Sequence, residues 1–107
     1  MRRYAMLIRL AEEHRETYLR LHEAVWPEVA ERIRACHIRN YTIFLRGDLL
    51  VGYYEYHGAD HAADMAAMAA DPATQRWWAL TDPCQRQLDG TPADSWWAPA
   101  DEIWHQD

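Results

Sequence analysis

The sequence predicts an α+β protein in which helices cover one face of a single four-stranded antiparallel sheet. Short runs of β-branched and aromatic residues, typical of strands, alternate with longer runs that carry apolar residues every four positions. Half of the residues are hydrophobic, and the six Trp and six Tyr supply large side chains for a core. A chain of 107 residues is long enough for one such core, so we expect a single domain over residues 1–107.

The first strand is predicted over residues 4–10, and residues 12–36 are predicted to be helical. Apolar residues recur every four positions in the helical region, at Leu21, Val25, Val29 and Ile33. Pro27 cannot donate a backbone hydrogen bond, and it disfavours helical geometry at the residue before it. We therefore expect two consecutive helices, or one bent helix, with the interruption at Trp26.

Two further strands are predicted as a hairpin, over residues 38–45 and 49–56, joined by a short link that contains Gly47. The second of them carries Tyr53, Tyr54 and Tyr56, so large side chains point to both of its faces. Helices cover only one face of such a sheet, and face-to-face pairing with a second copy would bury the other. We therefore expect a homodimer.

Aspartates mark the helices of the second half. Asp60 is a suitable N-cap for an alanine-rich helix to about residue 70, and Asp71 before Pro72 begins another helix to about residue 80. After a loop, residues 100–105 are predicted to form the last strand. The order strand, helix, strand, strand, helix, strand is the split βαβ arrangement of ferredoxin-like folds.

The composition excludes several classes of protein. The net charge is -6 and the chain has no basic cluster, so we expect no nucleic-acid partner. All basic residues are arginines, which rules out a Schiff-base lysine and a P-loop lysine. Ser95 is the only serine and lies outside any nucleophile-elbow motif. Cys36 and Cys84 form no CxxC motif, and we expect buried free thiols.

No segment approaches the roughly 20 apolar residues that a membrane span needs. The first ten residues, MRRYAMLIRL, are basic and then apolar, but Arg9 interrupts them and no small-residue cleavage site follows. We therefore expect a soluble, cytoplasmic protein with no membrane partner.

One helical stretch carries three side chains with polar tips. Tyr18, His22 and Trp26 are four residues apart, so they fall on one stripe of a helix. A phenol and an imidazole at this spacing can form a pair that transfers protons near neutral pH. A structural histidine beside an apolar stripe fits the same spacing.

A metal site is not expected. His57 and His61 have the spacing of two ligands on one helix, yet Gly58 and a strand-to-helix junction lie between them. The four glycines form no dinucleotide-binding array.

Three motifs resemble those of the L-rhamnose mutarotase family. HEAVWPE, from His22 to Glu28, is similar to the family's H-x-x-x-W-P-E segment, and Tyr18 precedes the histidine as the family's tyrosine does. NYTIFL, residues 40–45, resembles the family's N-Y-x-I-x-L strand. The Arg76-Trp77-Trp78 run, with Thr81-Asp82 after it, resembles a further element of the family. The resemblance covers roughly three-quarters of the chain, up to Asp82.

This resemblance implies a ferredoxin-like, dimeric α/β barrel that acts as an isomerase without a cofactor. The implied reaction interconverts the α and β anomers of a 6-deoxy-hexose by acid/base opening and closing of the ring. The sugar that the resemblance favours is L-rhamnose. The resemblance implies that His22 is the proton donor and that Tyr18 acts beside it. It further implies that the sugar contacts Tyr18, Tyr41, Trp77 and Trp78.

Beyond Asp82 the chain departs from the family, and the Trp96-Trp97 pair is not one of its usual features. If this segment folds over the pocket, the preferred sugar can be L-fucose or a related sugar; otherwise the pair packs at the dimer interface. Related barrels include cofactor-free monooxygenases, haem-handling proteins and non-catalytic ligand-binding modules, and the fold does not separate them. The combination of residues that favours the mutarotase is Tyr18, His22, Tyr41, Trp77 and Trp78.

Overall fold

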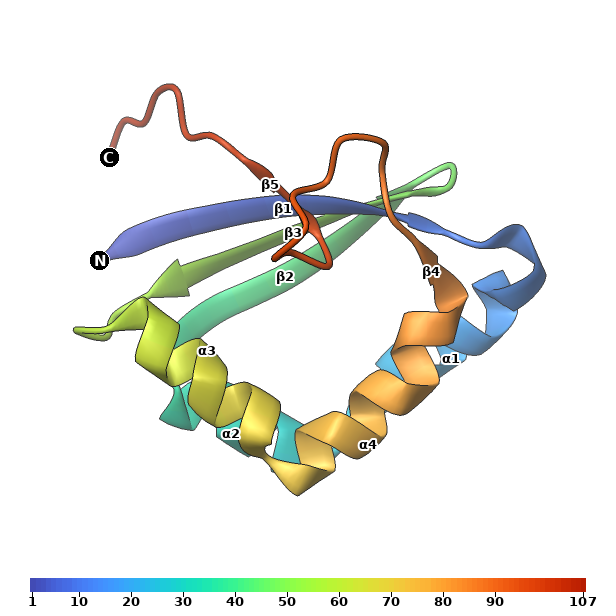
Figure 1. Cartoon of the computed structure of the whole chain (residues 1–107), viewed down its shortest axis with the longest axis horizontal. Helices are drawn as coiled ribbons and strands as arrows, with labels where there is room; N and C mark the ends of the chain where they lie inside the picture. The colour runs from blue at the N-terminus through green and yellow to red at the C-terminus, as the bar shows by residue number, and fades with distance from the viewer.

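A computed structural model describes residues 1–107 and places an antiparallel sheet over a layer of helices (Figure 1). The long strands are β1 (Arg2–Leu10), β2 (Ile38–Arg46) and β3 (Leu49–Tyr56). Two short strands, β4 (Gln85–Arg86) and β5 (Ala98–Ala100), both pair with β1. The strand order β2-β3-β1-β4, with every pair antiparallel, confirms the predicted ferredoxin-like α+β fold.

The helices begin and end close to the predicted positions. They are α1 (Arg15–Glu23), α2 (Pro27–Ala35), α3 (His61–Ala70) and α4 (Pro72–Thr81), with 3-10 turns at Glu12–His14 and Asp82–Cys84. Pro27 starts α2, so the predicted interruption yields two separate helices. The Asp60 carboxylate accepts a hydrogen bond from the Ala63 amide at 3.1 Å, and Asp71 caps α4 in the same way. None of these helices has the length and apolarity that a bilayer crossing requires.

The prediction for the last strand was wrong. The strand lies at Ala98–Ala100 rather than 100–105, and the unpredicted β4 precedes it on the same edge of β1. The apolar residues that suggested a strand, Ile103 and Trp104, are 94 % and 74 % exposed. The ladder with β1 ends at the pair Ala5 and Ala100, and beyond it the Arg3 side chain contacts Glu102 instead of extending the ladder.

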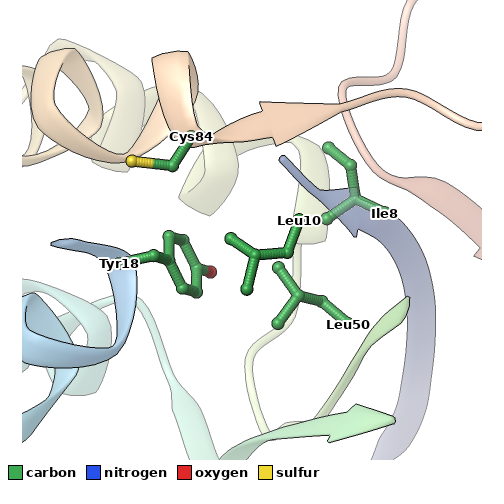
Figure 2. Close-up of a cluster of buried hydrophobic side chains, with 5 residues drawn as sticks. All are labelled: Ile8, Leu10, Tyr18, Leu50 and Cys84. Carbon is green, nitrogen blue, oxygen red and sulfur yellow. The ribbon is translucent and has the colours of Figure 1, made fainter. Parts of the chain in front are cut away.

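Side chains on the inner face of the sheet point toward the helices and form two hydrophobic clusters. One cluster joins β1 and β3 to α1 and the turn after α4, through Ile8, Leu10, Tyr18, Leu50 and Cys84 (Figure 2). The other joins β2 and β3 to α3, through Cys36, Ile38, Tyr54, Tyr56 and Met68. Both cysteines are free and buried, as expected from the sequence.

The outer face of the sheet is apolar and no helix covers it (Figure 1). Alternation along the paired strands directs Leu7, Val51, Tyr53 and Phe44 to this side. The Phe44 side chain is 60 % exposed. Single exposed apolar residues are ordinary, but neighbouring ones on one sheet face form a patch that needs a physical explanation.

Strand β2 contains a bulge at Asn40 and Tyr41. Its pairing with β3 is regular up to Arg39 and resumes at Thr42, so two residues of β2 oppose one of β3. Asn40 has a φ of 52°, in the left-handed region that asparagine tolerates better than most residues. Its amide donates a hydrogen bond to the Glu55 carboxylate, while Tyr41 turns inward and stacks on Tyr54.

Candidate active site

A pocket of about 950 Å³ lies between the inner face of the sheet and the helices. This volume is near the upper end of the range of about 300–1,000 Å³ found for small-molecule sites. All four helices and the segment before β5 contribute to its lining. The five residues that the sequence suggested for the site all line it: Tyr18, His22, Tyr41, Trp77 and Trp78.

Tyr18 and His22 lie one turn apart on α1, with their ring centroids 4.3 Å from each other. Nδ1 of His22 is 2.8 Å from the backbone carbonyl oxygen of Tyr18. A carbonyl oxygen can only accept a hydrogen bond, so Nδ1 carries the proton in this contact. The neutral ring therefore keeps a free lone pair on Nε2, which suits it to accept a proton.

A chain of hydrogen bonds reaches Tyr18 from the C-terminal segment. Nε1 of Trp96 donates to Oε1 of Gln85 at 2.6 Å, and Nε2 of Gln85 donates to Oη of Tyr18 at 3.2 Å. Because Oη accepts this bond, its own hydrogen remains available to a ligand. Burial raises the pKa of Tyr18 to about 12, so the phenol stays protonated at neutral pH.

The two tryptophans of α4 differ in their surroundings. Trp77 is only 6 % exposed, and its ring meets those of His22 and Trp26 edge-on, at 5.5 and 5.2 Å between centroids. The prediction that Trp26 shares a helical stripe with Tyr18 and His22 was wrong, because α1 ends at Glu23 and Trp26 has an extended backbone before α2. Trp26 instead packs against Trp77. Trp78 is 37 % exposed and offers an accessible indole at the pocket.

Tyr41 reaches the pocket through the β2 bulge. Its ring stacks on Tyr54 with 5.6 Å between centroids. Desolvation, together with the neighbouring phenols of Tyr18 and Tyr54, raises the pKa of Tyr41, so this hydroxyl also stays protonated.

Several lining residues were missed or left open by the sequence. Trp96 and Trp97 line the pocket, as expected if the C-terminal segment folds over the site. A Cβ atom at Gly52 would lie 3.4 Å from the Trp97 ring and 3.1 Å from the Met6 sulfur, so a glycine leaves room for Trp97 on the sheet. Nothing in the sequence pointed to Gln85, whose role depends on contacts between distant segments.

Two more titratable side chains line the pocket. Asp82 follows α4, and burial raises the pKa of its carboxyl group. His61 begins α3 and contacts Tyr54, whereas His57 lies 3.9 Å from the Glu55 carboxylate. The two histidines considered as metal ligands therefore have different partners.

Comparison with known proteins finds one family along nearly the whole chain. A family model for L-rhamnose mutarotase matches residues 3–106. An L-rhamnose mutarotase of Burkholderia cenocepacia is 35% identical over 97 residues, covering 88% of this chain and 90% of the relative. One of Listeria monocytogenes is 32% identical over 88 residues, covering 80% of this chain and 82% of the relative.

A solved structure with low sequence identity has the same fold. The crystal structure of an L-rhamnose mutarotase from Formosa agariphila matches with a TM-score of 0.78 and 18% identity, over 100% of both chains. The family model and the Burkholderia relative span nearly all of this chain. The chain therefore belongs to the L-rhamnose mutarotase family.

Proposed function

We propose that this protein interconverts the α and β anomers of L-rhamnose by opening and closing the pyranose ring. The observation that carries the proposal is the Tyr18–His22 pair, which presents a proton acceptor and a proton donor to one pocket. Family membership supports the choice of sugar. The chemistry requires no cofactor, since only protons move.

Ring opening requires two proton transfers. The anomeric hydroxyl loses its proton while the ring oxygen gains one, and the C–O bond between the anomeric carbon and the ring oxygen breaks to give the open aldehyde. Closure on the other face of the aldehyde reverses both transfers. Each group therefore acts as a base in one half of the cycle and as an acid in the other.

His22 suits the anomeric hydroxyl. Its Nε2 has a free lone pair, because Nδ1–H is held by the Tyr18 carbonyl. Nε2 accepts the proton of the anomeric hydroxyl as the ring opens and returns a proton as the ring closes. His22 is therefore the proton donor during ring closure. Tyr18 is placed to donate its phenol hydrogen to the ring oxygen, because Gln85 already occupies a lone pair of Oη.

Aromatic walls suit the rest of the sugar. A 6-deoxy-hexose has a methyl group and apolar C–H faces, which pack well against indole and phenol rings. We assign this role to Trp78, Tyr41 and Trp77, with Trp96 and Trp97 closing the pocket from the C-terminal segment.

The proposal is tested by NMR saturation transfer between the two anomeric proton signals. The purified protein is expected to accelerate exchange of L-rhamnose far above the buffer rate, and L-fucose is measured beside it as the alternative substrate. A protein that leaves both exchange rates at the buffer value would refute the proposed function. A Soret band in the absorbance spectrum would instead favour a haem-binding protein.

Gln85→Leu is expected to slow exchange by about tenfold. The change leaves the Tyr18 hydroxyl and the Trp96 indole N–H without their partner, and an unsatisfied buried polar group costs roughly 1–3 kcal/mol. Gln87→Leu is the matched control, because Gln87 also holds the C-terminal segment, through the Ser95 and Trp96 carbonyls, but does not contact Tyr18. Equal rates in the two variants would remove Gln85 from the mechanism.

We also propose that the protein is a homodimer that works in the cytoplasm. The support for a dimer is the uncovered outer face of the sheet, with Phe44, Val51, Tyr53 and Leu7 exposed or half-buried. A second copy of the sheet placed on this face would bury them. Two free, buried cysteines fit a reducing compartment.

Phe44→Glu is expected to convert the dimer to a monomer at micromolar concentration, because it places a charge among the apolar side chains of the proposed interface. Sedimentation velocity measures the change. Leu80→Glu is the control, since Leu80 is an exposed apolar residue of α4 on the helical side of the molecule. A monomeric wild-type protein would count against the sheet-to-sheet dimer.

A further inference from the structure

A second phenol–imidazole pair lines the same pocket. Tyr54 lies on β3 and His61 begins α3, and Oη of Tyr54 is 2.7 Å from Nε2 of His61. This pair stands on β3 and α3, whereas Tyr18 and His22 stand on α1, and the start of α3 and α1 lie at opposite ends of the helical layer (Figure 1). Tyr18 and Tyr54 also belong to separate hydrophobic clusters. The ring-opening chemistry proposed above does not use Tyr54 or His61.

The pair can hold a sugar hydroxyl in either of its proton arrangements. If Tyr54 donates to Nε2, the ring nitrogen Nδ1 carries a free hydrogen and Oη keeps a free lone pair. If Nε2 donates instead, the tyrosine hydrogen is free and Nδ1 is the acceptor. In the first arrangement Oη of Tyr54 can accept a hydrogen bond from a ligand, and in the second it can donate one. A sugar hydroxyl can donate or accept, so it can bond to Oη in both arrangements.

The two side chains are fixed before any ligand binds. His61 stacks on Tyr4 at 4.2 Å between centroids with 9° between the planes, and Tyr56 meets it edge-on at 4.9 Å. Tyr54 is held between the rings of Tyr4 and Tyr41, at 5.1 and 5.6 Å. A side chain that is already ordered loses little rotational freedom on binding, so its hydrogen bonds contribute more of their free energy to affinity.

Both groups are uncharged near neutral pH. Burial, and then the positive charge of Arg2, lower the pKa of His61, and burial raises the pKa of Tyr54 to about 12. A neutral pair suits an uncharged ligand such as a sugar.

We propose that Tyr54 and His61 form a second anchor of the pocket, which binds a ring hydroxyl remote from the anomeric carbon and so selects which sugar is accepted. This inference rests on the proposed mutarotase function. It assigns the chemistry to the α1 end of the pocket and the recognition of hydroxyl configuration to the α3 end.

The first test compares Tyr54→Phe with Tyr53→Phe. These neighbours on β3 point to opposite faces, and each substitution removes one hydroxyl and keeps the ring. Tyr54→Phe is expected to raise the KM for L-rhamnose by about three- to tenfold at nearly unchanged kcat, the signature of lost binding that is equal in ground and transition states. Tyr53→Phe is expected to leave both constants at the wild-type values.

The second test asks whether the two residues act together. His61→Phe keeps a ring on Tyr4 but removes both nitrogens, and the double variant with Tyr54→Phe is expected to raise KM no more than the larger single change does. Deoxy analogues of L-rhamnose then identify the hydroxyl. One analogue is expected to bind the wild-type protein about three- to tenfold more weakly than L-rhamnose and to be insensitive to Tyr54→Phe.

Three results would overturn the inference. They are an unchanged KM in Tyr54→Phe, an equal rise in Tyr53→Phe, or a fall in kcat alone. Each of these results is compared with a wild-type protein that exchanges L-rhamnose. It would therefore refute the second anchor and leave the proposed function unaffected. A wild-type protein that exchanges no sugar refutes the function and this inference with it.

Discussion

Replacing His22 with alanine is expected to lower the anomer-exchange rate by about 10²-fold or more, the usual scale for a positioned acid/base group. Nδ1–H of His22 donates to the Tyr18 carbonyl, so the lone pair on Nε2 is free to accept a proton. The substitution removes this lone pair. Saturation transfer between the two anomeric proton signals of L-rhamnose measures the rate directly. The fold should survive, because His22 is only half-buried and belongs to neither hydrophobic cluster.

Tyr18→Phe is the companion variant, since it removes a hydroxyl and leaves the buried ring in place. It is also expected to slow exchange, because the phenol hydrogen that would reach the ring oxygen is lost. His22→Ala with a wild-type rate and an intact dimer would make His22 a structural residue and leave the proposed mechanism without its base.

Trp77→Ala is expected to lower the free energy of unfolding by about 3–5 kcal/mol, the usual cost of truncating a large buried aromatic residue. Trp77 is 6 % exposed and lies against both His22 and Trp26, so its loss leaves a cavity behind the His22 ring. Urea denaturation measures the loss. Protein concentration must be matched between variants, because the stability of a dimer depends on it.

Trp78→Ala is the control on the same helix. The Trp78 side chain is 37 % exposed, so its removal is expected to cost only about 1 kcal/mol while it weakens sugar binding in a fluorescence titration. Equal losses of stability in the two variants would contradict the different roles that their burial assigns.

Local signals were enough to predict most of the helices. Pro27 separates α1 from α2, and the Asp60 and Asp71 carboxylates cap α3 and α4, because capping and proline geometry involve only a few neighbouring residues. The hairpin over β2 and β3 was predicted for the same reason, since its link contains Gly47 at a φ of 60°.

The place of Tyr41 could not be predicted from alternation. In a regular β2 it would share a face with Arg39, which is directed outward, and only the bulge turns it toward the pocket. A bulge forms where one strand has one more residue than its partner between two paired positions, and the residues around Asn40 do not reveal that difference. The expectation for Tyr41 came from the family motif, and the structure supplies the physical reason.

The C-terminal segment was predicted least well, because its contacts are all long-range. Gln85 meets Tyr18, and Trp97 lies over Gly52, across large separations in sequence. The apolar residues near the terminus predict a strand, yet Ile103 and Trp104 remain exposed. Apolar residues indicate a strand only where a core is present to bury them.

The edge of β1 shows how this site can diversify. The chain leaves the sheet opposite Arg9 and rejoins it opposite Leu7, so residues 87–97 form a detour whose two ends are almost adjacent. The free energy of closing such a detour rises only slowly with its length. Evolution, or a protein engineer, can therefore lengthen or rewrite this detour, including Trp96 and Trp97, without shifting the register of any strand. Exchanging this one segment would change the wall of the pocket that Trp96 and Trp97 form, while Tyr18 and His22 keep their places on α1.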